Sequence, residues 1–332
     1  MNCAVVGATG AVGRELLGLL ESRAFPVAML RCFASPRSIG RKVPFAGRVI
    51  DVQALHEHAF DGCDFVFFDA SDAVSKEFVP FAVRSGAWVI DNSSVYRLDP
   101  QVPLIVPDVN AAMWNNSRIL AGPNCTTVQL VVFLAACAKV APLKRVVVAS
   151  YQSTSGAGLL AMDELRAGTV DFLESKPECR SFFPEPIAFN CIPQIGSFDA
   201  EGWTSEETKV MMETRKILGH EDLGLVATAV RVPTLHCHAQ SVFLEYSHDF
   251  TMEQVHTTLA DAPGIQLHAT YACSRGQYAA TGGDDVHVGR LRRDRSVPFG
   301  LAAWVVSDNL RRGAALNALH IAEMVCRGIA PS

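Results

Sequence analysis

The stretch that decides the fold is Cys3-Ala4-Val5-Val6-Gly7-Ala8-Thr9-Gly10-Ala11-Val12-Gly13-Arg14-Glu15. It joins a predicted apolar strand to a predicted amphipathic helix that runs to Leu20. Gly7 permits a tight turn, Gly10 lets the backbone approach a pyrophosphate, and Gly13 lets the helix pack on the strand. The helix N-terminus adds unpaired N–H groups and a positive dipole. The alternative is an ordinary glycine-rich turn, but the flanking strand and helix favour a dinucleotide site with the contacts Gly7, Thr9, Gly10, Ala11, Val12 and Gly13.

Beyond this turn, the first half of the chain alternates strand and helix patterns. Strands are predicted at Met29–Ala34, Phe65–Ala70, Trp88–Asp91 and Arg118–Ala121, with a helix at Val74–Arg84. Such alternation predicts a parallel, doubly wound sheet.

The pattern changes after Cys125. A helix is predicted to about Val140, followed by strands at Arg145–Tyr151, Leu225–Val232, Ser241–Ser247 and Leu301–Ser307. Asp308 is a good N-cap for a terminal amphipathic helix, and the charged, proline-rich stretch Asp171–Pro186 resembles an excursion or loop. The predicted fold is α/β: an N-terminal Rossmann domain, 1–124 completed by the helix 308–328, and an α+β substrate and dimerisation domain, 125–307, with a mixed sheet.

Composition excludes several classes of function. The 332 residues suffice for two domains, and 49% of them are hydrophobic while 19% are charged, as in a well-packed globular enzyme. A net charge of −5 gives no basic field for nucleic acid. The longest apolar stretch, Val128–Val140, is too short to span a membrane. Ten cysteines without a disulfide or metal pattern indicate a reducing compartment, so we expect a cytoplasmic protein that acts on small molecules.

The end of the second predicted strand indicates which dinucleotide is bound. Where an acidic residue would bind the ribose hydroxyl of NAD, the chain has Ala34-Ser35-Pro36-Arg37-Ser38. An arginine between serines suits a 2′-phosphate, since guanidinium makes charge-assisted hydrogen bonds to it. We therefore expect NADP bound by Ser35, Arg37 and Ser38, although a solvated surface arginine is the alternative.

One cysteine stands in a reactive context. Gly122-Pro123-Asn124-Cys125-Thr126-Thr127 follows a strand and precedes the long apolar helix, so Cys125 is predicted at a helix N-terminus, where a thiol pKa is lowered. A thiolate there would attack a carbonyl, and Asn124 with adjacent amides could stabilise the oxyanion. A buried structural cysteine is the alternative, because that is the commoner role of this residue.

Six stretches together resemble the aspartate-semialdehyde dehydrogenase family. They are Gly7–Gly13, Asp91-Asn92-Ser93-Ser94, Val106-Pro107-Asp108-Val109-Asn110, Pro123–Thr127, Tyr151-Gln152-Ser153-Thr154-Ser155-Gly156-Ala157-Gly158 and Val306-Ser307-Asp308-Asn309-Leu310. The resemblance spans nearly the whole chain. The related N-acetyl-glutamyl-phosphate reductases carry a different sequence around the cysteine.

The resemblance implies a homodimer and an NADPH-dependent reduction of 4-phospho-aspartate to aspartate semialdehyde with release of phosphate, toward lysine, threonine and methionine. Cys125 would carry the acyl group, Gln152 would orient it, and His238 would be the general acid/base. For the substrate the resemblance implies Arg231 at the carboxylate, Glu206 at the amino group, and Lys209, Arg97 and Asn92 at the phosphate. The further cofactor contacts that it implies are Ser71, Ser155, Gly156, Gly158 and Asn309.

Some residues depart from the family or allow another interpretation. His236 and His238 on an extended segment would point to one face, yet a His-x-His pair lacks the third ligand that zinc requires, so we expect no metal. Asp69-Ala70-Ser71-Asp72 replaces the family's Ser-Ala-Gly-Gly, and His320 stands where glutamine is usual. The alternatives to this function are a reductase of another acyl phosphate or of an acyl-CoA, and a catalytically silent paralogue.

Overall fold

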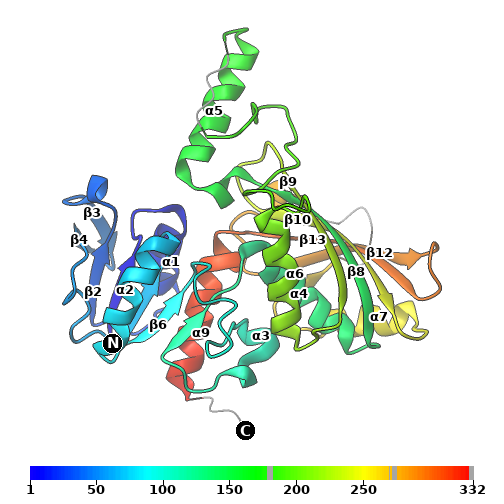
Figure 1. The fold of residues 1–332 in the computed structure, drawn as a ribbon, viewed down its shortest axis with the longest axis horizontal. Coiled ribbons are helices and arrows are strands. Elements are labelled where there is room, and N and C mark those ends of the chain that lie inside the picture. The colour runs from blue at the N-terminus through cyan, green and yellow to red at the C-terminus, as the bar shows by residue number, and fades with distance from the viewer. Residues whose placement is uncertain (178–181, 269, 271–274, 329–332) are drawn as a thin grey trace. The chain divides into compact units, whose positions relative to one another are not determined.

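The computed structural model describes residues 1–177, 182–268, 270 and 275–328. The chain divides into two compact units, Met1–Asn124 with Ala314–Ser332, and Cys125–Gly313 (Figure 1). Each unit has its own β-sheet, and the predicted α/β class is confirmed. The first sheet was expected to be parallel throughout, but the antiparallel hairpin of β3 and β4 makes it mixed, like the second.

The first unit is built on a seven-stranded sheet of order β3-β4-β2-β1-β5-β6-β7. Its strands are β1 Asn2–Val6, β2 Met29–Phe33, β3 Lys42–Phe45, β4 Arg48–Gln53, β5 Phe65–Phe68, β6 Trp88–Asp91 and β7 Ile119–Ala121. All neighbouring strands are parallel except β3 and β4. The strand order reverses at β1 and β5, and ligands of doubly wound sheets bind beyond the carboxyl ends of the strands at such a point.

Helices cover both faces of this sheet. Alternate residues of β1 face opposite sides: Cys3 and Val5 pack with α1 (Ala11–Ser22) and α9 (Leu316–Arg327), whereas Ala4 and Val6 pack on the side of α2 (Asp72–Arg84). Strands buried on both faces explain the uninterrupted apolar sequence of β5. The short helix α3 is Pro107–Asn110.

The second unit contains a mixed six-stranded sheet of order β11-β12-β13-β10-β8-β9. Its strands are β8 Leu143–Gln152, β9 Gly224–Arg231, β10 His238–Tyr246, β11 Ile265–Leu267, β12 Val286–Asp294 and β13 Gly300–Ser307. Its helices are α4 Cys125–Ala138, α5 Leu159–Leu173, α6 Ser205–Leu218, α7 Met252–Ala260 and α8 Gln277–Ala280. Thr204 and Glu207 form a capping box that starts α6, and Gly219 at φ 62° ends it.

Most predicted elements lie within three residues of the observed ones. The terminal helix differs: Asp308 accepts hydrogen bonds from the Leu310 and Arg311 N–H groups as a cap, but the first turn, Arg311–Ala315, is π-helical. The hairpin β3–β4 and strand β12 were missed because proline in the first and charged residues in the second obscure the alternation. The first residues of the predicted excursion, 171–173, instead complete α5, and residues 178–181 lie outside the described part. No helix among the described residues has the length and apolar character needed to cross a membrane.

Candidate active site

A pocket of about 620 Å³ opens at the carboxyl ends of β1, β2 and β5 in the first unit. Its walls include Gly7, Thr9, Gly10, Ser35 and Ser71 from the predicted cofactor residues. Gly10 occupies the N-cap position of α1 and no side chain caps the helix, so its first-turn N–H groups can receive an anion. This pocket therefore has the shape and polarity expected for a dinucleotide.

Contacts within the turn explain its glycines. Gly7 adopts φ +91°, and a Cβ on it would lie 2.1 Å from the Asp69 carbonyl oxygen. A Cβ on Gly13 would lie 2.3 Å from the Gly7 carbonyl oxygen. The turn is thus compressed between strand and helix, and Ala11 and Val12 follow it as the first residues of α1.

Of the predicted 2′-phosphate residues, Arg37 and Ser38 lie on the short 3₁₀ turn Pro36–Ser38, and Ser35 is its N-cap residue. Arg37 is exposed, whereas Ser38 is buried and its Oγ accepts a 3.2 Å hydrogen bond from Thr9 Oγ1. Ser35 and Pro36 line the pocket, while Arg37 does not. Arg37 therefore lies at the surface, outside the lining of the pocket.

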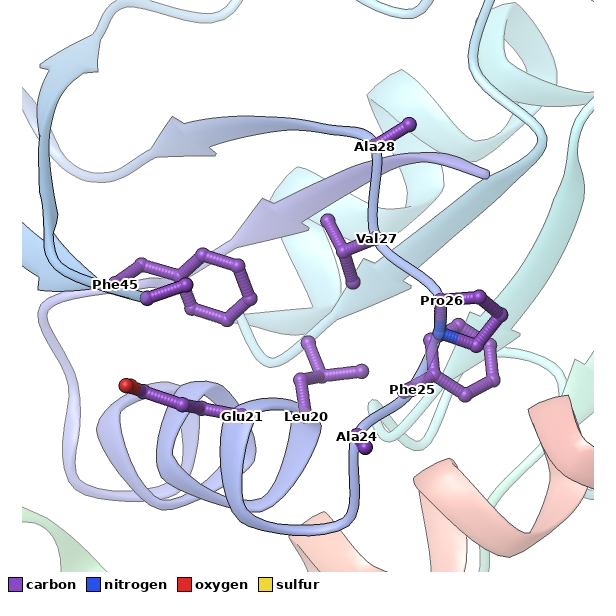
Figure 2. A pocket seen from close by; sticks show the side chains of 9 residues that line it. Leu20, Glu21, Ala24, Phe25, Pro26, Val27, Ala28 and Phe45 are labelled. Atoms are coloured by element: carbon purple, nitrogen blue, oxygen red, sulfur yellow. The ribbon is translucent and has the colours of Figure 1, made fainter.

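A second pocket, of about 480 Å³, lies at the opposite end of α1 and provides a contrast (Figure 2). Leu20, Phe25, Val27 and Phe45 line it, and Glu21 is its one charged side chain. It lacks a helix N-terminus and a glycine turn, so nothing in it would bind phosphate.

Cys125 is the first residue of α4 and is partly exposed. No disulfide joins the described cysteines, and burial raises the pKa of Cys3, Cys32, Cys137 and Cys237 to about 12. A Cβ placed on Gly313 would lie 2.9 Å from Cys125 Cβ and 3.0 Å from its carbonyl oxygen. The π-helical turn therefore packs directly against the cysteine, a contact that sequence reasoning missed.

Three predicted residues lie side by side in the sheet of the second unit. Gln152 at the end of β8 is in register with Arg231 of β9 and with His238 of β10. All three side chains are buried. Strand pairing thus brings together residues that are 79 and 86 positions apart in the chain.

Arg231 connects this row to two other predicted residues. Its Nη1 donates to the Ser153 carbonyl oxygen at 2.6 Å. Burial lowers the pKa of Arg231, while the charges of Glu206 and Cys125 act in the opposite direction. Glu206 on α6 and the nucleophile candidate are therefore close enough to Arg231 to interact electrostatically, as a substrate carboxylate would.

His238 is held in one orientation. Its Nδ1 accepts a 3.1 Å hydrogen bond from the Ser153 N–H, which places the proton of the neutral ring on Nε2. Nε2 is buried and has no hydrogen-bond partner among the described residues. Burial, followed by the Arg231 charge, lowers the pKa of His238 to about 3. The ring is therefore neutral at physiological pH and presents a donor.

A hydroxyl network supports His238. The Ser153 and Ser155 hydroxyls lie 2.9 Å apart, and Asn309 Oδ1 accepts from both, at 3.2 and 3.0 Å. Asn309 Nδ2 is buried without a hydrogen-bond partner in the described part of the chain. Ser153 belongs to the stretch Tyr151–Gly158, but its sequence does not indicate this role, because the contact with His238 arises only in the fold.

The remaining predicted residues are distributed over both units. Lys209 lies on α6 three residues after Glu206 and is partly exposed. Gly156 lies beside His238, since a Cβ on it would be 2.8 Å from Nε2, and Gly158 adopts φ +95° before α5. In the first unit, Arg97 Nε donates to the Gly122 carbonyl oxygen at 2.9 Å and Nη2 to that of Asn92 at 2.6 Å. Asn124 is buried.

The prediction that His236 and His238 share one face of an extended segment is wrong. Cys237 between them has φ +68°, so the backbone turns, and β10 begins only at His238. Among the described residues, no group of three or more His, Cys, Asp or Glu is placed to hold a metal ion.

Two residues that depart from the resembled family lie in the first unit. His320 lies on α9 and lines a small pocket with Glu323. Asp72 begins α2 and accepts a hydrogen bond from the Ser94 N–H.

The family comparisons agree with this arrangement. Residues 2–117 match the model of the semialdehyde dehydrogenase NAD binding domain, and residues 134–312 match that of the semialdehyde dehydrogenase dimerisation domain. The fold and site thus define a semialdehyde dehydrogenase.

Individual relatives show which family within this class the chain belongs to. The chain is 45% identical to an aspartate-semialdehyde dehydrogenase of Synechocystis over 98% of this chain and 97% of the relative, and 42% identical to one of Bacillus subtilis over 97% and 96%. The solved structure of aspartate semialdehyde dehydrogenase II of Vibrio cholerae superimposes with a TM-score of 0.95 at 40% identity, and the match covers 99% of this chain and 99% of that one. The same protein has also been solved in complex with ASA. The chain belongs to the aspartate-semialdehyde dehydrogenase family.

Proposed function

We propose that this chain is an NADP-dependent aspartate-semialdehyde dehydrogenase that reduces 4-phospho-L-aspartate through a thioester on Cys125. The observation that carries the proposal is the Arg231 site: an arginine buried beside Gln152 and His238 that interacts with Glu206 and Cys125. A cation, an anion and a nucleophile within reach of one another match a substrate that has a carboxylate, an ammonium and an acyl phosphate.

The first chemical step takes place at Cys125. Its thiolate adds to the acyl carbon of the substrate, the carbon–oxygen bond to phosphate breaks, and phosphate leaves with the bonding electrons. The position at the start of α4 favours the thiolate and directs backbone N–H groups, with Asn124, toward the developing oxyanion. When bound, NADPH would supply the hydride that reduces the thioester carbon.

His238 is the proposed general acid/base, and it acts through its Nε2–H group. Because Ser153 occupies Nδ1, the neutral ring donates a hydrogen bond from Nε2 to the oxyanion of the reduced intermediate and stabilises its charge. When the aldehyde is released, the carbon–sulfur bond breaks and its electrons leave with Cys125, which is regenerated as the thiolate. In this assignment Gln152 orients the acyl group from the neighbouring strand.

The substrate contacts follow the family pattern. Arg231 binds the carboxylate and Glu206 the ammonium, and both are held by the fold near Cys125. Lys209, Arg97 and Asn92 remain assigned to the phosphate by resemblance. Arg97 already donates to two backbone carbonyls, which fixes its guanidinium group in place.

The described residues fit a dinucleotide. The uncapped N-terminus of α1 suits a pyrophosphate, and Ser71 lies in the same pocket. In the second unit, Asn309 Nδ2 is a buried donor beside Ser155 that has no hydrogen-bond partner among the described residues, with Gly156 and Gly158 nearby in the chain. The assignment to NADP rather than NAD rests on Ser35, Arg37 and Ser38.

We assign dinucleotide binding to residues 1–124 with the terminal helix, and catalysis and dimerisation to the residues from 125 onward. A homodimer is supported by the match to a dimerisation domain and by exposed apolar residues in the second unit. Leu160, Phe172 and Leu173 are exposed on α5, which stands away from the sheet of its unit (Figure 1), and Phe243 is exposed on β10. The lack of disulfides among the described cysteines suits the reducing cytoplasm.

The proposal is tested by NADP reduction with aspartate semialdehyde and phosphate. Wild type should turn over only when phosphate is present, and NADP should be preferred to NAD. Cys125→Ser should lose activity on the order of 10⁴-fold, whereas Cys191→Ser, at an exposed cysteine, should not. Turnover with coenzyme A instead of phosphate would favour the acyl-CoA reductase, and no turnover of the wild type would favour a silent paralogue.

A further inference from the structure

Asp69 lines the cofactor pocket at a position where the sequence departs from the family that it resembles. It follows β5, at the point where the strand order reverses, and its carbonyl oxygen is in close contact with Gly7. Asp69 lines the pocket with Gly7 and Gly10. A carboxylate at this position is unexpected, because the dinucleotide that the pocket fits is itself anionic.

The Asp69 side chain is engaged on one side only. Oδ1 accepts a 2.6 Å hydrogen bond from Asn92 Nδ2. Oδ2 is inaccessible to solvent and has no partner among the described residues. The neighbouring buried carboxylate differs: Asp91 accepts from the hydroxyls of Ser75 and Ser93 through its two oxygens, at 2.8 and 2.6 Å. A buried carboxyl oxygen without a partner is costly unless a proton or a ligand completes it.

Asn92 transmits this contact to the loop before Cys125. Asn92 Oδ1 lies 2.2 Å from the place where a Cβ on Gly122 would stand, so only glycine allows the approach. Arg97 joins the two residues, because it donates hydrogen bonds to the carbonyl oxygens of both Asn92 and Gly122. Asp69, Asn92, Gly122 and Arg97 therefore form one continuous set of contacts within the first unit.

We propose that Asp69 is a positioning residue: from the wall of the dinucleotide pocket it holds the Asn92 amide, and through Asn92 it places Gly122, so that dinucleotide binding and the phosphate-binding residue are linked. The inference rests on the proposed function for the role of Asn92.

The ionisation of Asp69 gives the inference a pH signature. Burial and the nearby Asp91 charge raise its pKa to about 7, and the Asn92 hydrogen bond acts against them. The other charged groups around it are Asp72 and Glu77 on α2, and Arg97 beyond Asn92. Because an ionised carboxylate repels a dinucleotide phosphate, NADP⁺ binding should weaken as the pH rises through this pKa.

The first experiment measures the Kd of NADP⁺ by calorimetry at pH 6 and pH 8. Relative to Asp69→Asn, wild type should lose about tenfold in affinity over this interval, as expected for one group with a pKa about 7. Asp69→Asn also serves as the baseline for titration of the 2′-phosphate. Asp72→Asn, at an exposed carboxylate three residues away, should follow wild type. Parallel curves for wild type and Asp69→Asn would overturn the inference.

The second experiment tests the action through Asn92. Asp69→Ser should raise the KM for phosphate about fivefold with kcat little changed, but should have no further effect in an Asn92→Ala background. Asp69→Asn should restore a near-normal KM, since its amide oxygen can still accept from Asn92. Equal effects of Asp69→Ser in both backgrounds would overturn the link. The calorimetry needs no turnover, so it remains decisive if the proposed reaction fails.

Discussion

The turn Gly7–Gly13 in the first unit and the row Arg231–Gln152–His238 in the second both lie at strand ends, but they are assembled in opposite ways. The turn is one contiguous stretch whose contacts are local: Gly13 packs on Gly7, and Gly10 N–H bonds to Gly7 O at 2.9 Å. The row depends on the pairing of three strands distant in sequence. A local motif can be identified from its spacing alone, whereas a row across strands becomes visible only in the folded sheet.

The largest effect should come from the row. His238→Asn removes the Nε2 donor, and we expect kcat to fall by about 10²- to 10⁴-fold while the Kd of NADP⁺ changes less than about twofold. Steady-state kinetics and calorimetry on one preparation separate the two quantities. His220→Asn, at an exposed histidine of the same unit, is the matched control. A parallel loss of NADP⁺ binding would mean that the row and the turn are not independent.

The next effect should come from the turn. A Cβ on Gly13 would lie 2.3 Å from the Gly7 carbonyl oxygen and 2.9 Å from Ala8 Cα, both backbone atoms. Gly13→Ala should therefore displace the turn and weaken NADP⁺ binding by about tenfold to a hundredfold, equivalent to roughly 1–3 kcal/mol of overpacking. The rate at which iodoacetamide alkylates Cys125 should stay the same.

Gly18→Ala is the control for this substitution. Gly18 lies in the same helix, and a Cβ there would meet nothing within 4 Å. The change should leave NADP⁺ affinity unaltered and stabilise the helix by about 0.5–1 kcal/mol. Equal losses of affinity in the two variants would show that the tight contact of Gly13 is unimportant.

These two regions also explain how far the sequence could be interpreted. The Rossmann turn, the parallel strands and Cys125 at the start of α4 were accessible because each is marked by nearby glycines, by apolar periodicity or by its position before a helix. Arg231, Glu206 and His238 were found by resemblance only; no spacing relates Glu206 to Arg231, because a helix and a strand bring them together.

The missed features are all contacts made by backbone or by unremarkable side chains. Ser153 fixes the His238 tautomer with its N–H group, and Gly313 packs on Cys125 through a π-helical turn. The expectation for His236 was wrong for a similar reason, because a positive φ at Cys237 could not be read from a β-like stretch. Asp69 and Asn92 are both marked by the sequence, but their hydrogen bond is visible only in the fold.

The missed glycine gives a third prediction. Gly313→Ala would place a Cβ 2.9 Å from Cys125 Cβ and 3.0 Å from its carbonyl oxygen, so the cysteine must shift. We expect kcat/KM to fall about tenfold, as for a nucleophile misplaced by a fraction of an ångström, with NADP⁺ affinity maintained. Stopped-flow measurement of the acylation step checks this, and an unchanged rate would show that the π-helical turn yields without moving Cys125.

The smallest effect concerns Arg37, which follows the second strand beside the turn. Arg37 is exposed and lies outside the pocket lining, so solvent screens any bond to a 2′-phosphate. Arg37→Ala should weaken NADP⁺ binding by about fivefold to tenfold and leave NAD⁺ binding unchanged. The loss should shrink as salt is raised from 50 to 500 mM, whereas Arg48→Ala, at an exposed arginine of β4, should show neither effect. If the NADP⁺ and NAD⁺ affinities fall together, Arg37 supports the turn rather than recognising the phosphate, and the local region would then depend, like the row, on residues outside its own motif.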